Sequence, residues 1–231
     1  MVDRKASGEK TNTANLRGES RGELAYQFLI DAISSGRLLP GTRIREVDIA
    51  KQTGLSRTPV REAINRLQIE GIVSNSATGG TIVTELDQTM ISELYVMREV
   101  LEGTAAAQAA RHASDVEISF LREISDRDET LKDTIDVARN NKLFHVTLYR
   151  CSHNRYLLKM LNSLHESMML LGASTLGREG RPSIARAEHA AIIDALENRD
   201  PEKASEAARK HIRAAFKVRL ETFFENLENP R

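Results

Sequence analysis

The segment that most constrains the fold of this chain covers residues 55–73, LSRTPVREAINRLQIEGIV. Its apolar side chains recur at the spacing of one α-helix face, at Val60, Ala63, Ile64 and Leu67. Its basic and hydrogen-bonding side chains lie away from that face, at Arg57, Thr58, Arg61, Asn65 and Gln68. Pro59 suits a first helical turn, and Gly71 suits the position just past a helix end. The segment therefore predicts a short helix that packs through one face and exposes a basic one.

The neighbouring segments predict the elements of a winged helix-turn-helix. For the basic helix alone, arginines that only solvate the surface are an equal explanation. The ordered set of helices, turn and hairpin favours DNA binding, with the helix-turn-helix running from Glu46 to Asn65. In chain order the expected elements are a helical stripe over residues 25–33, a helix over 46–53 ended by Gly54, the basic helix, and β-type runs at 72–73 and 81–83.

Residues 55–67 resemble the recognition segment of the GntR family of bacterial winged-helix regulators, whose pattern is close to V-S-R-x-P-V-R-E-A-L-x-x-L. The resemblance implies contacts with phosphates and guanine edges at the family's arginine and threonine positions, here Arg57, Thr58 and Arg61. It also implies that a wing-tip glycine, Gly79 or Gly80, enters the minor groove. Asn65 shares the exposed helix face and is a further expected DNA contact.

Bulk composition sets limits but does not identify the chain. Net charge is zero, although residues 1–84 carry 12 Lys and Arg against 9 Asp and Glu. This small excess agrees with DNA binding at the front of the chain. Cys151 is the only cysteine, which excludes an intrachain disulfide. Because no apolar run approaches the roughly 18 residues of a membrane span, and the N-terminus lacks a signal-peptide core, we expect a cytoplasmic protein without a membrane partner.

Composition and periodicity predict a mainly α chain with a polar leader and two domains. Residues 1–20 are expected to be a disordered leader, 21–86 the winged helix-turn-helix, and 87–227 an all-α bundle of about six helices, to which the family resemblance assigns effector binding and dimerisation. Ser114 with Glu117 suggests a capping box. The expected bundle helices cover residues 87–112, 114 to about 131, 133–151, 154–172, 184–198 and 200–227, with a loop at 177–182.

Three histidines of the predicted bundle stand beside apolar faces of different helices: His145, His189 and His211. Asn141 precedes His145 by one helical turn, so both side chains emerge on the same side. Three imidazoles and one oxygen donor from facing helices suit a divalent ion such as zinc or nickel. Hydrogen-bonded core histidines explain the same spacing, and from spacing alone they are the better explanation.

Residues 87–225 resemble the effector-binding, FCD-type domain of the FadR branch of the GntR family. The resemblance implies one divalent cation held by Asn141, His145, His189 and His211, and it favours the metal over core histidines. Many members have Asp where this chain has Asn141, which implies a weaker site. The matching signature consists of Arg98 with Glu102, residues 141–145, residues 152–154, residues 188–196, and His211. The remaining histidines match no ligand position, and for His165 a surface or packing role is favoured over a place in the cavity: His112, His153 and His165.

Arg98 has two interpretations. It is either a surface arginine or, by the resemblance, a clamp for the carboxylate of an effector beside the metal. Effectors of this branch are mostly small organic acids, sugar acids or fatty acyl derivatives. We therefore expect a ligand-responsive regulator, with repression the expected direction. A homodimer would read a pseudo-palindromic operator.

Two rival functions and one rival role for the metal remain open at this point. The ion itself could be the effector of a metal sensor. Alternatively, three histidines could activate water in a metal-dependent enzyme, although the sequence identifies no general base. Finally, the metal could be purely structural and only shape the cavity.

Overall fold

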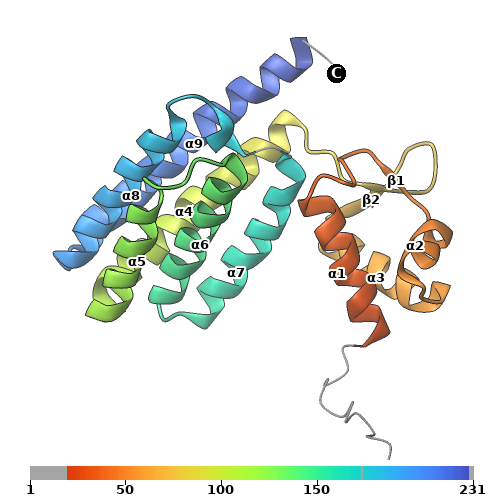
Figure 1. The fold of residues 1–231 in the computed structure, drawn as a ribbon, viewed down its shortest axis with the longest axis horizontal. Coiled ribbons are helices and arrows are strands. Elements are labelled where there is room, and N and C mark those ends of the chain that lie inside the picture. The colour runs from red at the N-terminus through yellow and green to blue at the C-terminus, as the bar shows by residue number, and fades with distance from the viewer. Residues whose placement is uncertain (1–19, 173, 229–231) are drawn as a thin grey trace, which may run out of the picture.

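The chain folds into two domains that lie end to end along the long axis of the molecule (Figure 1). The structure is a computed structural model, and it describes residues 20–172 and 174–228. The leader expected over residues 1–20 lies outside the described residues apart from Ser20. The Ser20 hydroxyl accepts a hydrogen bond from the Glu23 amide and so caps the first helix.

The first domain is a winged helix-turn-helix. Its three helices surround a small antiparallel sheet with strand order β1-β3-β2, in which Asn75 is paired with Thr81 and Val73 with Val83. Strand β1 was not predicted, because two residues are too few to show an alternating pattern. The elements are α1 (Arg21–Ser34), β1 (Arg43–Ile44), α2 (Glu46–Thr53), α3 (Arg57–Ile69), β2 (Val73–Asn75) and β3 (Thr81–Val83).

The predicted apolar stripe of α3 forms the centre of this domain's core. Its four residues are buried with side chains of α1 and the sheet: Val60, Ala63, Ile64 and Leu67. Gly54 ends α2 with a φ of 70°, a left-handed conformation that glycine adopts without steric cost, and the chain then turns directly into α3. Local sequence therefore fixes both the buried face of α3 and its position after α2.

The second domain contains six α-helices within the described residues. The predicted fold class, a winged helix-turn-helix followed by a bundle of about six helices, is thus confirmed. The helices are α4 (Gln88–His112), α5 (Asp115–Arg127), α6 (Thr134–Cys151), α7 (Arg155–Ser167), α8 (Arg181–Glu197) and α9 (Pro201–Glu228), and two short 3₁₀ helices, η1 (Met168–Leu171) and η2 (Thr175–Gly177), follow α7.

Two helix ends differ from the sequence prediction. Helix α5 was expected to run towards Leu131 but ends at Arg127, where the Asn140 amide from α6 donates to the Ile124 carbonyl and to Asp128 Oδ1. This contact from another helix satisfies a terminal carbonyl of α5. Helix α7 stops before residue 172 because the chain tightens into η1.

The expected loop at residues 177–182 is shorter than predicted. Helix α8 already begins at Arg181, with Pro182 in its first turn, and η2 ends at Gly177. A proline is tolerated in a first turn because its missing N–H has no helical acceptor there. Three residues therefore remain between η2 and α8.

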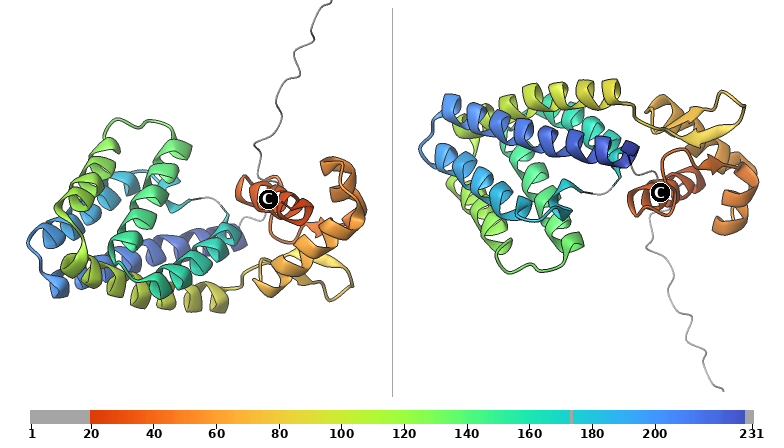
Figure 2. Two further views of the ribbon diagram at one scale, coloured as in Figure 1. Left: turned by 90° about the horizontal axis from the view of Figure 1, so that it is seen from below. Right: turned by 90° about the horizontal axis from the view of Figure 1, so that it is seen from above.

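Helices α4 and α9 run alongside each other through the bundle (Figure 2). Small residues of α4 permit this close approach, and a Cβ atom on Gly103 would lie 2.8 Å from Arg209 Nε. The central core cluster includes Ala105, Ala106 and Ala109 of α4. The Ala-rich end of α4 thus brings α9, and with it His211, close to the other helices of the bundle.

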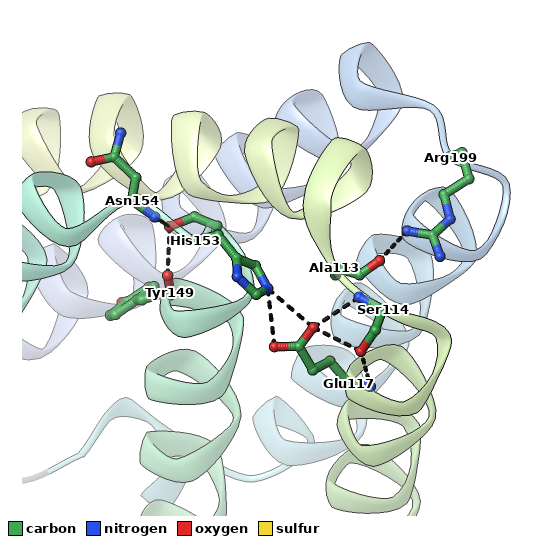
Figure 3. A network of polar contacts seen from close by, with 8 residues as sticks. Ala113, Ser114, Glu117, Tyr149, His153, Asn154 and Arg199 are labelled. Carbon is green, nitrogen blue, oxygen red and sulfur yellow. Dashed lines mark hydrogen bonds and ion pairs between the residues drawn. The ribbon is translucent and has the colours of Figure 1, made fainter.

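The predicted capping box of α5 is present, and it joins three turns of the bundle (Figure 3). Ser114 Oγ accepts from the Glu117 amide, while Glu117 accepts from the Ser114 amide at 2.8 Å. Glu117 also lies 3.1 Å from His153 Nε2, and Arg199 donates to the Ala113 carbonyl. His153 is half-exposed in this network, so it belongs to a surface turn.

The two domains are also joined by η1. Leu170 is 4% exposed and packs within the core of the winged helix-turn-helix, although it belongs to a segment that follows α7. Beside it, the Ser34 hydroxyl of α1 donates to Met169 Sδ at 3.8 Å. A segment of the bundle thus completes the core of the other domain. Among the described helices, none is long and apolar enough to cross a membrane.

Candidate functional sites

Helix α3 presents the predicted DNA-binding side chains on one exposed face. The Arg57 and Arg61 side chains are 61% and 58% exposed, and both bind Glu46, the first residue of α2. Arg57 Nη2 lies 2.9 Å from Glu46 Oε2, and Arg61 Nε lies 2.7 Å from Glu46 Oε1. Hydrogen bonds from Arg61 and then Arg57 lower the pKa of Glu46 to about 2. Glu46 therefore orients both guanidinium groups while leaving them accessible.

The remaining predicted contacts extend this face towards the wing. Thr58 and Asn65 are exposed on the same side of α3 as the two arginines. The Gln68 amide, one turn further along, donates to Asn75 Oδ1 at 3.1 Å and so connects α3 with β2. The recognition helix and the wing are thus held together by side-chain contact as well as by the chain.

The wing turn requires glycine for two different reasons. Gly79 and Gly80 have φ values of 83° and 90°, which disfavour other residues. In addition, Arg43 of β1 crosses the turn, and its Nη2 donates to the Gly79 carbonyl at 2.7 Å. A Cβ on Gly80 would lie 2.6 Å from this Nη2, whereas a Cβ on Gly79 would meet nothing within 4 Å. Arg43 was missed by the sequence analysis because it lies in the unpredicted strand β1.

The three histidines converge in the bundle. His145 of α6, His189 of α8 and His211 of α9 are buried, and one ring nitrogen from each lies within 4.8 Å of the others. The Nε2 atoms of His145 and His211 are 3.3 Å apart. Side chains separated by up to 66 residues therefore present their nitrogens to a common point, as metal ligands do.

Two carboxylates support this cluster from outside. Glu102 Oε2 lies 2.9 Å from His145 Nδ1, and Glu188 Oε2 lies 2.7 Å from His211 Nδ1. A carboxylate at Nδ1 fixes the orientation of an imidazole and leaves Nε2 for a metal ion. Although burial opposes its ionisation, Arg98 and then His145 keep the pKa of Glu102 well below its usual value. The Nδ1 atoms of His145 and His211 therefore each face a carboxylate that is also paired with an arginine.

His189 bears on the choice between a metal site and ordinary core histidines. It is 1% exposed and its ring stacks on Phe144 at a centroid distance of 4.0 Å. Among the described residues, neither ring nitrogen of His189 has a hydrogen-bond partner. Burial, and then His211 and His145, keep its pKa well below the usual value, so the imidazole is neutral. A neutral, unpaired imidazole beside two oriented ones fits a metal ligand, since a buried polar group is costly without a partner.

Asn141, the fourth predicted ligand, stands one turn before His145 on α6. It lines the same cavity as His145 and His211. Asn141 therefore stands beside the space where an oxygen ligand is expected, and its coordination of the ion stays a prediction.

A cavity of about 430 Å³ adjoins the cluster and reaches both domains. One wall contains Arg98 of α4 with His145 and His211, and another contains Tyr26, Gln27 and Ile30 of α1. Described residues of η1 and η2 line a further side. The histidine cluster therefore opens into a space that the DNA-binding domain helps to enclose.

Arg98 is buried in the wall of this cavity, which excludes the surface interpretation. It is 5% exposed, its Nε donates to Glu102 Oε1 at 2.8 Å, and its guanidinium lies 4.9 Å from the centre of the Tyr95 ring. His165 also lines the cavity, the place that was considered but not favoured from the sequence. Burial, followed by nearby Lys142, lowers the pKa of His165 to about 4.

Two further cavity arginines and the role of Glu188 were not predicted from the sequence. Arg181 lay in the expected loop, where no helical pattern pointed to its orientation, and Arg219 had no motif around it. Arg181 Nη2 donates to Glu188 Oε2 at 2.8 Å, and Arg219 Nη1 donates to the Leu171 carbonyl at 3.0 Å. Glu188 stood within the resembling stretch, but only the structure pairs it with His211.

Comparison with known proteins identifies the family. Residues 22–83 match the family described as bacterial regulatory proteins of the gntR family, and residues 93–214 match the FCD domain. The chain belongs to the GntR family. Its FCD domain places it in the FadR-like branch, as the sequence resemblance implied.

Individual relatives of this GntR protein support the same family assignment. It is 34% identical over 194 residues to the "Probable D-xylose utilization operon transcriptional repressor" of Paenarthrobacter nicotinovorans, covering 81% of this chain and 83% of that protein. It is 32% identical over 184 residues to the "Nta operon transcriptional regulator" of Aminobacter aminovorans, with 79% and 86% covered. The solved structure of E. coli McbR/YncC shares the fold with a TM-score of 0.74, at 22% identity over 89% of this chain and 100% of that one.

The family establishes the general function. The protein is a DNA-binding transcriptional regulator and not an enzyme, so the metal-dependent enzyme considered from sequence is excluded. In addition, the two carboxylates nearest the histidines, Glu102 and Glu188, are already held by histidine and arginine.

Proposed function

We propose that this GntR regulator is a cytoplasmic repressor that senses a small organic acid in the histidine-lined cavity. In this proposal residues 21–86 bind operator DNA and residues 87–227 form the sensor. One observation carries the proposal: a single cavity is lined both by His145 and His211 and by α1 of the DNA-binding domain. A ligand in that cavity contacts both domains at once. Relatives named as repressors of a D-xylose utilization operon and of a gluconate operon support repression as the direction.

A divalent metal ion, zinc or nickel, is part of this proposal. His145, His189 and His211 would hold it, with Asn141 as the oxygen ligand. The unpaired nitrogens of His189 and the carboxylates behind the other two histidines support this assignment. When bound, the ion supplies positive charge and open coordination positions for an acid oxygen. Arg98 lies in the same wall and is the proposed partner of the acid group.

The route from cavity to DNA passes through η1 and α1. Arg219 lines the cavity and donates to the Leu171 carbonyl of η1, while Leu170 of η1 packs in the core that contains α1 and α3. An acid that binds one arrangement of these elements more tightly than another shifts the regulator towards that arrangement. The spacing of the two recognition helices in a dimer would change accordingly.

A homodimer follows from the way such regulators read DNA, and α4 offers a surface for it. Four apolar side chains on the outer side of α4 are exposed: Met90, Val96, Met97 and Val100. Exposed apolar side chains gathered on one helix are typical of an interaction surface. Light scattering should therefore give twice the 25.8 kDa mass of one chain, and a monomeric mass at operator-binding concentrations would refute the dimer.

The sensing proposal is tested with metal-loaded protein on a duplex selected by the wild type from random DNA. Adding an acid from a panel of lactate, gluconate, succinate and citrate should weaken binding by roughly 5- to 150-fold, the usual size of allosteric coupling. Metal analysis should find one divalent ion per chain, lost in His211→Ala. His153→Ala is the matched control, because His153 lies in the surface turn and should keep the ion.

The rival metal sensor gives a different result. In that case a chelator alone abolishes DNA binding, and none of the acids changes it. A protein that retains full acid response after the metal is removed would instead restrict the ion to a structural role.

A further inference from the structure

We infer that the cavity recognises an acid with at least two carboxylates, and that Arg181 binds the second one. This inference rests on the proposed acid-sensing function and specifies its ligand class. It assigns to Arg181 of α8 a role parallel to that of Arg98 of α4.

Two matching chains of residues approach the histidine cluster. On one, Arg98 contacts Glu102 at 2.8 Å, and Glu102 contacts His145 at 2.9 Å. On the other, Arg181 contacts Glu188 at 2.8 Å, and Glu188 contacts His211 at 2.7 Å. Both arginines line the cavity. Two arginines with similar contacts, one from α4 and one from α8, therefore line the same cavity, so a ligand bound there can meet both guanidinium groups.

Arg181 has unused hydrogen-bonding capacity. It is 4% exposed, and its Nη2 is occupied by Glu188. Its Nε and Nη1 are buried and have no hydrogen-bond partner among the described residues. A guanidinium never loses its proton in proteins, so these donors stay charged and costly until an acceptor reaches them. The cavity that Arg181 lines is the place from which an anionic acceptor can come.

The charges around the cavity also favour a multiply charged anion. Among its described lining residues are four cationic side chains and one carboxylate, Glu166, and two more carboxylates, Glu102 and Glu188, lie directly behind the arginines. With Arg219, which binds the Leu171 carbonyl, left aside, three cations face three carboxylates, and the proposed divalent ion leaves an excess of two positive charges. A monocarboxylate neutralises only part of this excess. The lining cations are Arg98, Lys142, Arg181 and Arg219.

The size of the cavity limits the ligand further. A volume of about 430 Å³ lies towards the lower end of the range for small-molecule sites. The space therefore suits a short di- or tricarboxylate, with one acid group at Arg98 and the proposed metal ion and another at Arg181. A long acyl chain would exceed it.

Pairs of acids that differ only in the second carboxylate test this inference. Calorimetry with metal-loaded protein should show that succinate binds at least about tenfold more tightly than butyrate, and malate more tightly than 3-hydroxybutyrate. Arg181→Gln should weaken the diacids by roughly 10- to 100-fold, the value of hydrogen bonds to a charged group, and the monoacids by less than about threefold. Arg186→Gln, an arginine of the same helix that pairs with Glu129 outside the cavity, should leave all four affinities unchanged.

Arg181→Lys provides a second variant, because it keeps a positive charge beside Glu188 but lacks the Nε and Nη1 donors. It should retain the metal and show the same selective loss of diacid affinity. Equal binding of succinate and butyrate by the wild type, or equal losses for both acids in the variants, would overturn the role of Arg181 while leaving acid sensing intact. Failure of all four acids to bind while lactate or gluconate still binds would overturn this inference alone. Failure of these four and of lactate, gluconate and citrate would overturn the proposed acid-sensing function and this inference together.

Discussion

Arg61→Ala is expected to weaken binding to a wild-type-selected duplex by roughly 10- to 100-fold for each half-site, and to relax the base preference there. A bidentate arginine contact with a guanine edge is worth about 1–3 kcal/mol of discrimination. Arg61 stands at the centre of the exposed face of α3, and Glu46 holds its guanidinium in place before DNA arrives. In a dimer the loss occurs twice. Fluorescence anisotropy at one fixed salt concentration measures the affinity.

Arg66→Ala is the matched control for this experiment, since it removes the same charge from the same helix. Arg66 faces α1, where its guanidinium lies 3.6 Å from the centre of the Tyr26 ring and binds Glu23 and Glu70. Its removal should change affinity only through long-range charge and leave base preference intact. Equal losses for the two variants, or an unchanged base preference in Arg61→Ala, would show that α3 does not read bases through Arg61.

Glu102→Ala is expected to lower the free energy of unfolding by about 3–5 kcal/mol, because it leaves a buried charge without its partner. The side chains of Glu102 and Arg98 are only 2% and 6% exposed, and Glu102 also contacts His145. The guanidinium cannot lose its proton to escape the low-dielectric interior. Urea unfolding at neutral pH, where the carboxylate is ionised in both the folded and the unfolded chain, gives the value. Metal-free protein isolates the ion pair from any effect of the metal.

Two comparisons make the Glu102 result specific. Glu99 lies on the same helix as Glu102 but forms a surface ion pair, with Arg213 of α9. Glu99→Ala should therefore lower the free energy of unfolding by no more than about 1 kcal/mol. Replacing Arg98 and Glu102 together by methionine should recover much of the loss, since apolar residues of similar size often substitute for a buried ion pair. If Glu102→Ala unfolds within about 1 kcal/mol of the wild type, the interior at this point is more polar than the geometry implies.

The sequence predicted most of the helices because their signals are local. The stripe of α3, the capping residues Ser114 and Asn154, and the glycine after α2 each act within a few residues. Features that depend on distant contacts could not be predicted in this way. Strand β1 exists only through its pairing with β3, and the end of α5 is fixed by Asn140 of another helix.

The candidate sites also differ in whether local sequence or distant contacts determine them. The exposed face of α3 follows from helical periodicity, so its members were found from sequence. The histidines were found, but spacing alone favoured ordinary core residues, and the family resemblance was needed to favour a metal. Arg181, the first residue of α8, pairs with Glu188 in the middle of the same helix, and Glu188 contacts His211 of α9. Nothing in the spacing of single residues indicates which carboxylate faces which histidine.

The position of Leu170 affects how such a regulator can be divided or recombined. A fragment that ends at residue 86 lacks one of the side chains that fill the hydrophobic interior around α1 and α3. Exchange of sensors between members of the family therefore transfers part of the DNA-reading unit as well. A chimera that joins this winged helix-turn-helix to a foreign sensor must therefore supply an apolar residue at the position of Leu170. Without it, the core of the DNA-binding domain contains a void. The DNA-binding domain is thus complete only with a residue of the sensor domain, although the two domains are consecutive segments of the chain.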